Sequence, residues 1–264
     1  MRPLAELTPS ALAELTGVIF DVDDTLTTHG LLHVEALEAL WSLHRAGLLL
    51  VAVTGRPLGW ADVMAAMWPI DLAIGENGAG WARREGGALR LGYFDDEGTR
   101  AAQASVLDAV REAVERELPE VRVASDQAGR RCDLAFDVGE GVRLAPPLVA
   151  RLVEVIEASG AAALVSSVHA HVVPGAWDKA TGARRAVRDA LGIELDPARW
   201  LFAGDSGNDA AAFAFFELTV GVANVREHLA RLPVPPRWIT EEARSLGFRE
   251  LARHVLRARE ARLG

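Results

Sequence analysis

The segment from Gly17 to Thr27 constrains the fold of this chain most, because a short apolar run there ends in three carboxylates within four positions. An apolar run of this length is typical of a short interior strand, and the Asp-x-Asp that follows then lies at the strand's carboxyl end. Open α/β sheets bind ligands at that edge. The alternative is an ordinary turn, since Asp and Thr are common in turns and helix caps.

Composition restricts the class of protein. The 264 residues suffice for one large domain or two modest ones, and the balance of half hydrophobic and a quarter charged residues is that of ordinary soluble globular proteins. The formal net charge of -9 argues against a nucleic-acid backbone as the main partner. An anionic small-molecule substrate remains compatible with it, because a local group of Lys, Arg and backbone N–H groups can oppose the overall field.

The N-terminal segment and the single cysteine bear on location. Glu6 and Glu14 interrupt the apolar residues of the N-terminus, so no secretory signal is expected. No window reaches the roughly twenty apolar residues of a membrane span. Cys132 cannot form an internal disulfide, which fits a reducing compartment. We therefore expect a cytoplasmic protein with no membrane partner, either a monomer or a small homo-oligomer.

The segment after the acids predicts the beginning of a doubly wound, Rossmann-like parallel sheet. Residues 34–44 have the apolar spacing of a helix that ends at Gly47, and the continuous apolar run 48–53 predicts a strand buried on both faces. A strand, a helix and a parallel strand form a right-handed crossover. Thr54 should therefore emerge beside Asp21 at the same edge of the sheet.

A change of pattern near residue 84 predicts an inserted domain. Strands with alternating polarity and two long helices replace the continuous apolar strands, and alternation implies a sheet with one exposed or ligand-facing side. The buried pattern resumes near Trp177, with a helix over 179–191 and an apolar strand over 200–204. The predicted fold class is therefore α/β, a parallel-sheet core with an inserted α/β domain. Its sections are 1–83 (core), 84–174 (insertion) and 175–264 (core).

Four chemical features occur along the chain in order: acids after the first strand, a polar residue after the second, a lysine at the start of a helix, and acids after a later strand. Together they resemble the haloacid dehalogenase-like phosphatase superfamily, whose signature is hhhhDxDxT, a strand-terminal Thr or Ser, a Lys, and GDxxND. The Gly-Glu-Asn-Gly-Ala turn and the insertion after the third strand resemble its subgroup with a large α/β cap, the type IIB or Cof-like members, which include sugar-phosphate phosphatases. The matching residues are Asp21, Asp23, Thr54, Lys179, Asp205, Asn208 and Asp209.

The resemblance implies a magnesium site. Asp21 and Asp205 would be direct ligands, joined by the backbone carbonyl of Asp23, and Asp209 would support the hydrated ion. Magnesium fits this chemistry, because it prefers oxygen ligands and retains several waters. Its charge would also reduce the repulsion between a carboxylate and a doubly anionic phosphate monoester.

The resemblance also implies roles in phosphoryl transfer. Asp21 would attack phosphorus and form an aspartyl-phosphate, and Asp23 would act as acid and base. Thr54 and Lys179 would bind the transferring phosphoryl group. Further candidates for contacts with phosphate or substrate are Gly55, Arg56, Asn77, Asn208, Arg130 and Arg131.

Several of these residues keep a second interpretation. Asn77 either orients substrate or only caps its turn, and Arg56 either reaches phosphate or forms a surface ion pair. Arg130 and Arg131 belong to the insertion, where a solvated face is the alternative. Asp24 stands where the first motif often has Gly, and we interpret it as a structural residue.

The sequence thus predicts a magnesium-dependent phosphohydrolase of a small phosphorylated metabolite, with a sugar phosphate as the favoured substrate class. A sugar phosphomutase would use the same residues, and only its products would distinguish it. A non-catalytic binding protein is the third interpretation, which the complete set of acids disfavours.

Overall fold

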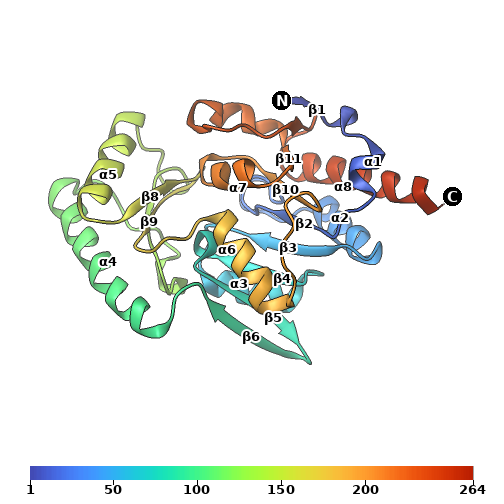
Figure 1. The fold of residues 1–264 in the computed structure, drawn as a ribbon. Coiled ribbons are helices and arrows are strands. Elements are labelled where there is room, and N and C mark those ends of the chain that lie inside the picture. Colours follow the sequence, from blue (N-terminus) through green and yellow to red (C-terminus); the bar gives the residue numbers. More distant parts are fainter. Residues whose placement is uncertain (264) are drawn as a thin grey trace.

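Nine strands form one mostly parallel sheet in the part of the chain that the computed structural model describes, residues 1–263 (Figure 1). In chain order the strands are β1 (Arg2–Pro3), β2 (Gly17–Phe20), β3 (Leu49–Val53), β4 (Leu72–Gly75), β5 (Gly80–Glu85), β6 (Ala88–Tyr93), β10 (Trp200–Gly204), β11 (Leu218–Gly221) and β12 (Trp238–Ile239). Across the sheet their order is β1-β12-β11-β10-β2-β3-β4-β5-β6. The predicted doubly wound core is confirmed.

The strand order places the candidate residues at one edge of this sheet. β2 lies between β3 and β10, and the three strands are parallel. Asp21, Thr54 and Asp205 each follow directly after one of them. Because parallel strands end at the same edge, these three residues converge there, as the crossover argument predicts.

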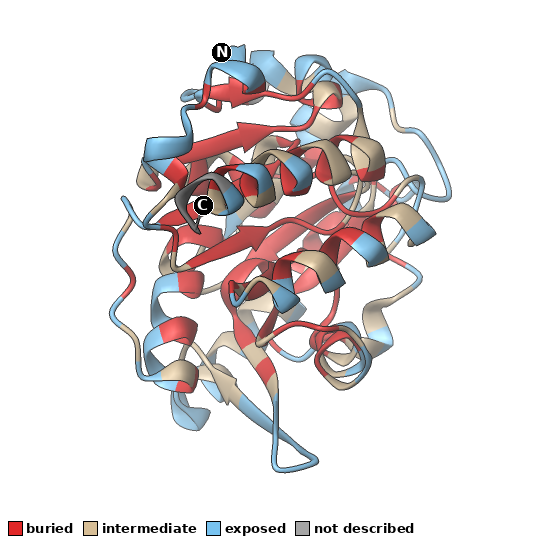
Figure 2. Cartoon of the chain, turned by 90° about the vertical axis from the view of Figure 1, so that its right-hand side faces the viewer, coloured by how far each residue is buried: buried red, intermediate tan, exposed pale blue. Residues whose placement is uncertain are grey.

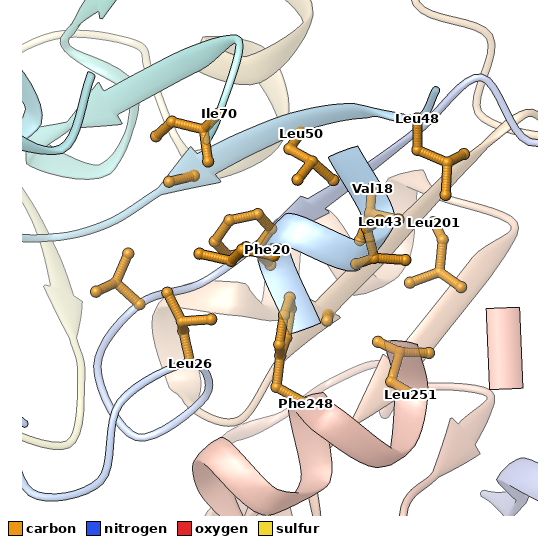
Figure 3. Packing of buried hydrophobic residues seen from close by; sticks show 14 of the residues in the cluster. Val18, Phe20, Leu26, Leu43, Leu48, Leu50, Ile70, Leu201, Phe248 and Leu251 are labelled. Atoms are coloured by element: carbon orange, nitrogen blue, oxygen red, sulfur yellow. The ribbon is translucent and has the colours of Figure 1, made fainter. Parts of the chain in front are cut away.

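Helices cover both faces of the sheet, so the central strands are buried (Figures 1 and 2). The helices of the core are α1 (Pro9–Leu12), α2 (Val34–Arg45), α3 (Leu58–Met67), α6 (Lys179–Ala186), α7 (Ala210–Phe215) and α8 (Arg244–Leu263). Val18 and Phe20 of β2 face α1, α2, α3 and α8, while Ile19 between them faces α6 and α7. Phe20 packs against Phe248 of α8 with ring centroids 5.1 Å apart (Figure 3). No helix within residues 1–263 is both long and apolar enough to cross a membrane.

A second, three-stranded antiparallel sheet lies beside the core and carries two helices (Figure 1). Its elements are α4 (Glu97–Glu117), β7 (Leu134–Asp137), α5 (Pro146–Ala158), β8 (Ala162–Val165) and β9 (His169–Val173), with strand order β7-β9-β8. Ala170 and Val172 of β9 pack with the two helices in a separate apolar cluster. The alternate residues His169 and His171 therefore lie on the opposite face of this sheet.

The β5–β6 hairpin differs from the expected division of the chain. The insertion was expected to begin at residue 84, but β5 pairs with β4 and β6 pairs with β5, so residues 80–93 extend the core sheet. β6 is the edge strand of that sheet, and its residues are exposed or half-buried. We propose residues 94–174 as the inserted unit and call them the cap below.

The helix that carries Lys179 approaches a core turn closely. Gly182 of α6 lies against Gly78, and a Cβ added to Gly182 would come within 2.3 Å of the Gly78 Cα. Gly78 has a φ of +117°, a conformation that favours glycine. The contact is backbone against backbone, so no rotamer change could accommodate a side chain at position 182.

We expect Gly182→Ala to lower the free energy of unfolding by about 1–3 kcal/mol, the typical cost of overpacking, although alanine favours helices more than glycine does. The matched control is Gly98→Ala in α4, where the nearest atom to an added Cβ is 3.4 Å away. Urea unfolding of both variants measures the difference. Equal stabilities would contradict the close contact.

Candidate active site

Three carboxylates and one ammonium group form a buried cluster at the carboxyl edge of the core sheet. Lys179 Nζ lies 2.5 Å from Asp21 Oδ1 and 2.6 Å from Asp209 Oδ1. One carboxylate oxygen from each of Asp21, Asp205 and Asp209 lies within 4.8 Å of the others. All four side chains are buried. The structure therefore brings four of the predicted site residues into one place.

Local sequence fixes the position of Lys179. It is the first residue of α6, and a capping box precedes it, in which Asp178 accepts the backbone N–H of Thr181 and the Thr181 hydroxyl accepts the backbone N–H of Asp178. This cap defines where the helix begins, and the first side chain of the helix then reaches the ends of β2 and β10.

The charges of the cluster are not balanced. Burial raises the pKa of Asp21 to about 7, despite the opposing charge of Lys179. Burial and then the charges of Asp21 and Asp209 raise the pKa of Asp205 well above its ordinary value. Burial opposes the charge of Lys179, but Asp209 and Asp21 hold its pKa above the ordinary value. The cluster carries an excess of carboxylates in a buried place, which a divalent cation would offset.

Asp205 is oriented as a metal ligand would be. Thr25 Oγ1 donates to its Oδ1 over 3.2 Å, and Asn224 Nδ2 donates to its Oδ2 over 2.8 Å. Such supporting hydrogen bonds fix the direction of a ligating carboxylate, and carboxylate oxygens are the ligands that Mg²⁺ prefers. Sequence reasoning gave no role to Thr25, the threonine of the hhhhDxDxT motif, and it missed Asn224. The available signal for Asn224 was its position just after β11, at the same edge of the sheet.

Asp209 has a different environment from Asp205. Its Oδ2 accepts the backbone N–H groups of Asp205 and Ser206 at 2.8 and 2.9 Å, and its Oδ1 contacts Lys179. Nearby, Asn208 Nδ2 donates to Asn77 Oδ1 over 2.8 Å, which joins the loop after β10 to the glycine-rich turn. Asp209 therefore holds the loop and the lysine in place.

The carboxylate of Asp23 lies outside the group that could share one metal ion. Arg56 binds both of its oxygens, with Nε 3.0 Å from each and Nη2 2.8 Å from Oδ1. Thr54 Oγ1 lies 3.5 Å from Asp23 Oδ2. The neighbouring Asp24 has a positive φ of 56° and accepts a hydrogen bond from Arg244 Nε, so its side chain supports the loop.

Arg56 links Asp23 to the cap. Its Nη1 lies 3.3 Å from Asp126 and 2.7 Å from Glu140, and its guanidinium carbon lies 4.8 Å from the centroid of the Trp60 ring. The side chain is only 4% exposed, so it is not a surface ion pair. Burial opposes its charge, but Asp23 and then Glu140 hold the pKa of Arg56 above the ordinary value.

Three cavities border Asp23, and two of them adjoin the cap. The larger has a volume of about 480 Å³ and lies between core and cap. The smaller, of about 10 Å³, lies beside the nucleophile candidate Asp21. Since a volume of this size holds about one water molecule, a phosphoryl group can reach Asp21 only when the cap moves away. Residues that line the larger cavity include Asp23, Arg56, Asn224, Glu140, Arg143 and Ser166.

Arg130 and Arg131 differ from their predicted role in substrate binding. Arg130 is buried, pairs with two acids of the cap and donates to the carbonyl oxygen of Gly55 over 2.9 Å. Arg131 pairs with Asp62 of α3. Neither arginine lines any of the three cavities beside Asp23. Arg130 pairs with acids that lie four and three residues away along the chain, and Arg131 pairs with an acid of the core.

Glu76 is a central residue that sequence reasoning missed. Its Oε1 accepts the backbone N–H groups of Leu58 and Arg131, both at 2.9 Å, and its Oε2 accepts those of Cys132 at 2.6 Å and Asp133 at 3.0 Å. Leu58 begins α3 of the core, and the other three residues belong to the cap. Burial and then Asp133 raise the pKa of Glu76 to about 7, although the four N–H groups favour its charged form. One carboxylate thus joins cap and core.

Solved structures of other proteins share the fold of this chain. No protein-family model matches the chain, and no curated protein matches it. Among solved structures, the sucrose-phosphatase of Synechocystis sp. PCC6803 in complex with sucrose and phosphate superposes on 92% of this chain and 98% of its own, with a TM-score of 0.65 and 17% identity. The C-terminal domain of trehalose-6-phosphate phosphatase from C. albicans covers 99% and 97%, with a TM-score of 0.66 and 14% identity.

A third similar structure is a sugar phosphatase. The sugar phosphatase BT4131, of subclass IIB of the haloacid dehalogenase superfamily, covers 90% of this chain and 98% of its own, with a TM-score of 0.60 and 17% identity. The chain therefore has the fold of the haloacid dehalogenase superfamily phosphatases. This fold includes the large α/β cap, as the motifs predict.

We expect Glu76→Gln to lower the free energy of unfolding by about 2–4 kcal/mol. An amide can accept through one oxygen only, so two of the four buried N–H donors lose their acceptor, at about 1–3 kcal/mol each. The control is Glu120→Gln on the exposed surface of the cap, which should stay within about 0.5 kcal/mol of the wild type. Urea unfolding that shows no difference between the two variants would contradict this role.

The acid cluster predicts how the stability of the metal-free protein depends on pH. The folded pKa values of Asp21 and Asp205 are raised, so the folded state retains protons that the unfolded state releases. The resulting stabilisation is present below about pH 4 and is lost as the pH rises through about 7. We expect the Tm without metal to fall between about pH 5 and pH 8, and Mg²⁺ to raise it most at the higher pH, because ligands bind when deprotonated.

Asp205→Asn tests the origin of this dependence. The variant should show a shallower fall of Tm with pH and a smaller increase on addition of Mg²⁺. Asp108→Asn, on the exposed side of α4, is the matched control and should behave as the wild type. Equal slopes in the two variants would exclude Asp205 as a source of the effect.

Proposed function

We propose that this protein is a magnesium-dependent phosphohydrolase of a small phosphorylated metabolite. The observation that carries the proposal is the buried cluster of Asp21, Lys179 and Asp205, which lies beside Asp23 and a cavity between core and cap. The fold shared with sugar-phosphate phosphatases supports the same conclusion.

Asp21 is the nucleophile of the proposed reaction. Lys179 holds its Oδ1, and its other oxygen is then positioned to attack phosphorus in line and to form an aspartyl-phosphate. The ammonium group of Lys179 also offsets negative charge on the transferring phosphoryl group. Thr54 follows the neighbouring strand β3 and offers its hydroxyl to the same group, next to the backbone of Gly55.

Asp23 carries the proton in both steps. It gives a proton to the leaving alcohol oxygen and later takes one from the attacking water. The guanidinium of Arg56 fixes the orientation of this carboxylate. Asn208, through its hydrogen bond to Asn77, keeps the loop after β10 beside the phosphoryl position.

The chain's carboxylates would hold the metal ion. Asp21, Asp205 and the backbone carbonyl of Asp23 would be its ligands, and Asp209 would hold the loop behind them. When bound, magnesium supplies positive charge that offsets the repulsion between a carboxylate and a doubly anionic ester. The buried excess of acids described above is the structural reason to expect such an ion.

A sugar phosphate is the favoured substrate class. The larger cavity, at about 480 Å³, has the size of a small-molecule site. Its charged and hydroxyl-bearing lining suits a polar alcohol. Two of the similar structures are phosphatases of sucrose phosphate and trehalose 6-phosphate by name.

A sugar phosphomutase, which would transfer the phosphoryl group to a second sugar, is the alternative activity and would use the same residues. Product analysis distinguishes the two activities: release of free phosphate indicates hydrolysis, and interconversion of isomers with a bisphosphate activator indicates a mutase.

We expect Asp21→Asn to lower phosphate release from p-nitrophenyl phosphate by at least about 10³-fold, because the nucleophile is removed. Chelation of metal should abolish wild-type turnover, and Mg²⁺ should restore it. Asp108→Asn is the control and should retain the wild-type rate. Turnover by a folded Asp21→Asn variant at a wild-type rate would exclude the mechanism.

A further inference from the structure

The two outermost strands of the core sheet differ in how they are protected. β1, at one edge, is two residues long and contains Pro3, which has no N–H group to donate. β6, at the other edge, has six residues and pairs with β5 through all of them without a bulge. It contains no proline, and its one charged residue, Arg90, forms an ion pair with Glu85. Edge strands are commonly protected by short length, proline, charge or bulges, so β6 is the less protected edge.

The outer side of β6 offers unpaired backbone groups. Within residues 1–263, no backbone hydrogen bond joins β6 to any segment other than β5, and β6 lies at the margin of the molecule (Figure 1). Gly86 and Gly87 turn the chain into β6 with φ values of +56° and +87°, and a type I′ turn requires positive φ at both positions. This tight turn fixes the register of the hairpin. An ordered row of N–H and C=O groups is therefore available to a further strand.

An apolar surface adjoins this edge. Leu89 and Leu91 are two residues apart, so they point to the same face of the sheet, and they are 41% and 45% exposed. Leu91 lies opposite Ala82, which belongs to the apolar cluster that includes residues of α3. On that face of the sheet, Val63 and Met67 of α3 are exposed as well. Exposed apolar side chains thus gather beside the unpaired strand, as they do at surfaces that bind another protein.

We propose that β6 pairs with β6 of a second copy of this chain, so that the two core sheets join into one continuous sheet. Main-chain hydrogen bonding to an exposed edge strand is a recurring mode of recognition. A two-fold axis, the commonest symmetry of oligomers, brings the same surface of both copies together. Two copies of one strand then run antiparallel. This inference concerns assembly and goes beyond the proposed activity.

The residues of β6 complement one another in this arrangement. In an antiparallel pair around a two-fold axis, one residue lies opposite its own copy. If that residue is Leu91, then Leu89 lies opposite Tyr93 of the second copy, and on the other face Arg90 lies opposite Gly92. An axis at Arg90 would instead set two guanidinium groups against each other, and like charges directly opposite are destabilising. The sequence of β6 therefore favours a second copy as the partner and Leu91 as the residue on the axis.

The pairing edge lies away from the candidate active site. β3, β4 and β5 lie between β6 and β2, whose end carries Asp21. Adjacent strands are about 4.8 Å apart, so three intervening strands separate the edge well from the acid cluster. Loss of the dimer should therefore leave the rate of phosphate release per chain unchanged.

Sedimentation velocity of the full chain tests the pairing. At high protein concentration the wild type should sediment as a dimer, with twice the 28.3 kDa mass of one chain. Leu91→Lys sets two ammonium groups against each other on the axis, so the Kd of the dimer should rise by at least about 100-fold. Leu229→Lys is the matched control and should keep the wild-type Kd, since Leu229 is also exposed but lies between β11 and β12, near the other edge.

A wild type that remains a single chain at every concentration overturns the inference. A Leu91→Lys variant that dimerises as tightly as the control overturns it as well. Neither readout uses phosphate release, so the inference and the proposed function fail independently of each other.

Oxidative crosslinking gives a second measurement, which decides if the lysine variant does not fold. In Leu91→Cys the two introduced thiols lie opposite each other and should form a disulfide between the copies. Leu89→Cys, which lies opposite Tyr93, is the control and should not crosslink. The native Cys132 is buried, so the wild type should show no crosslink under the same conditions. Absence of the disulfide in Leu91→Cys, or equal crosslinking of Leu89→Cys, contradicts the proposed pairing.

Discussion

The buried ammonium group of Lys179 is the interaction on which the site depends. Transfer of a charge into a protein interior costs several kcal/mol unless partners compensate it, and here Asp21 and Asp209 contact the lysine directly. The same ammonium allows carboxylates from two strand ends to lie close together. Its position follows from the start of α6, which the capping box of Asp178 and Thr181 defines, and from the close approach of Gly182 to Gly78. Local capping and a backbone contact together determine where this buried charge lies.

Many groups at the junction between core and cap are charged or polar, although Cys132 and Val173 of the cap also belong to an apolar cluster of the core. Arg56 joins Asp23 to Glu140, and Glu76 accepts backbone N–H groups from both sides. Charged groups can be solvated by water when the two units separate, and apolar surfaces cannot. This composition suits a cap that must move for substrate to enter, and it makes the orientation of Asp23 depend on where the cap lies.

Much of the fold could be predicted from sequence, because the parallel strands are buried on both faces and form continuous apolar runs. The acids after β2 and β10 could be found for the same reason, since no packing requirement explains them. The hairpin of residues 80–93 could not be assigned to the core, because its outer strand is an exposed edge strand and lacks the continuous apolar run of the buried core strands.

The contacts of individual side chains could not be predicted from the sequence. The adjacent arginines Arg130 and Arg131 suggested an anion site, yet Arg130 pairs with the nearby acid Asp133 and Arg131 pairs with the distant Asp62. Glu76 looked like an ordinary turn residue because its four donors are backbone groups, which leave no pattern in the sequence.

The hydrogen bond between Glu76 and the backbone of Cys132 has a consequence for the redox chemistry of the protein. Cys132 is the only cysteine, and the junction that holds its backbone also covers its side chain. Burial and then the neighbouring charge of Glu76 raise the pKa of the Cys132 thiol to about 12. The thiolate is the form that reacts with oxidants and alkylating reagents. Almost no thiolate of Cys132 is present at neutral pH while cap and core are in contact. The reactivity of the Cys132 thiol therefore depends on whether cap and core are in contact.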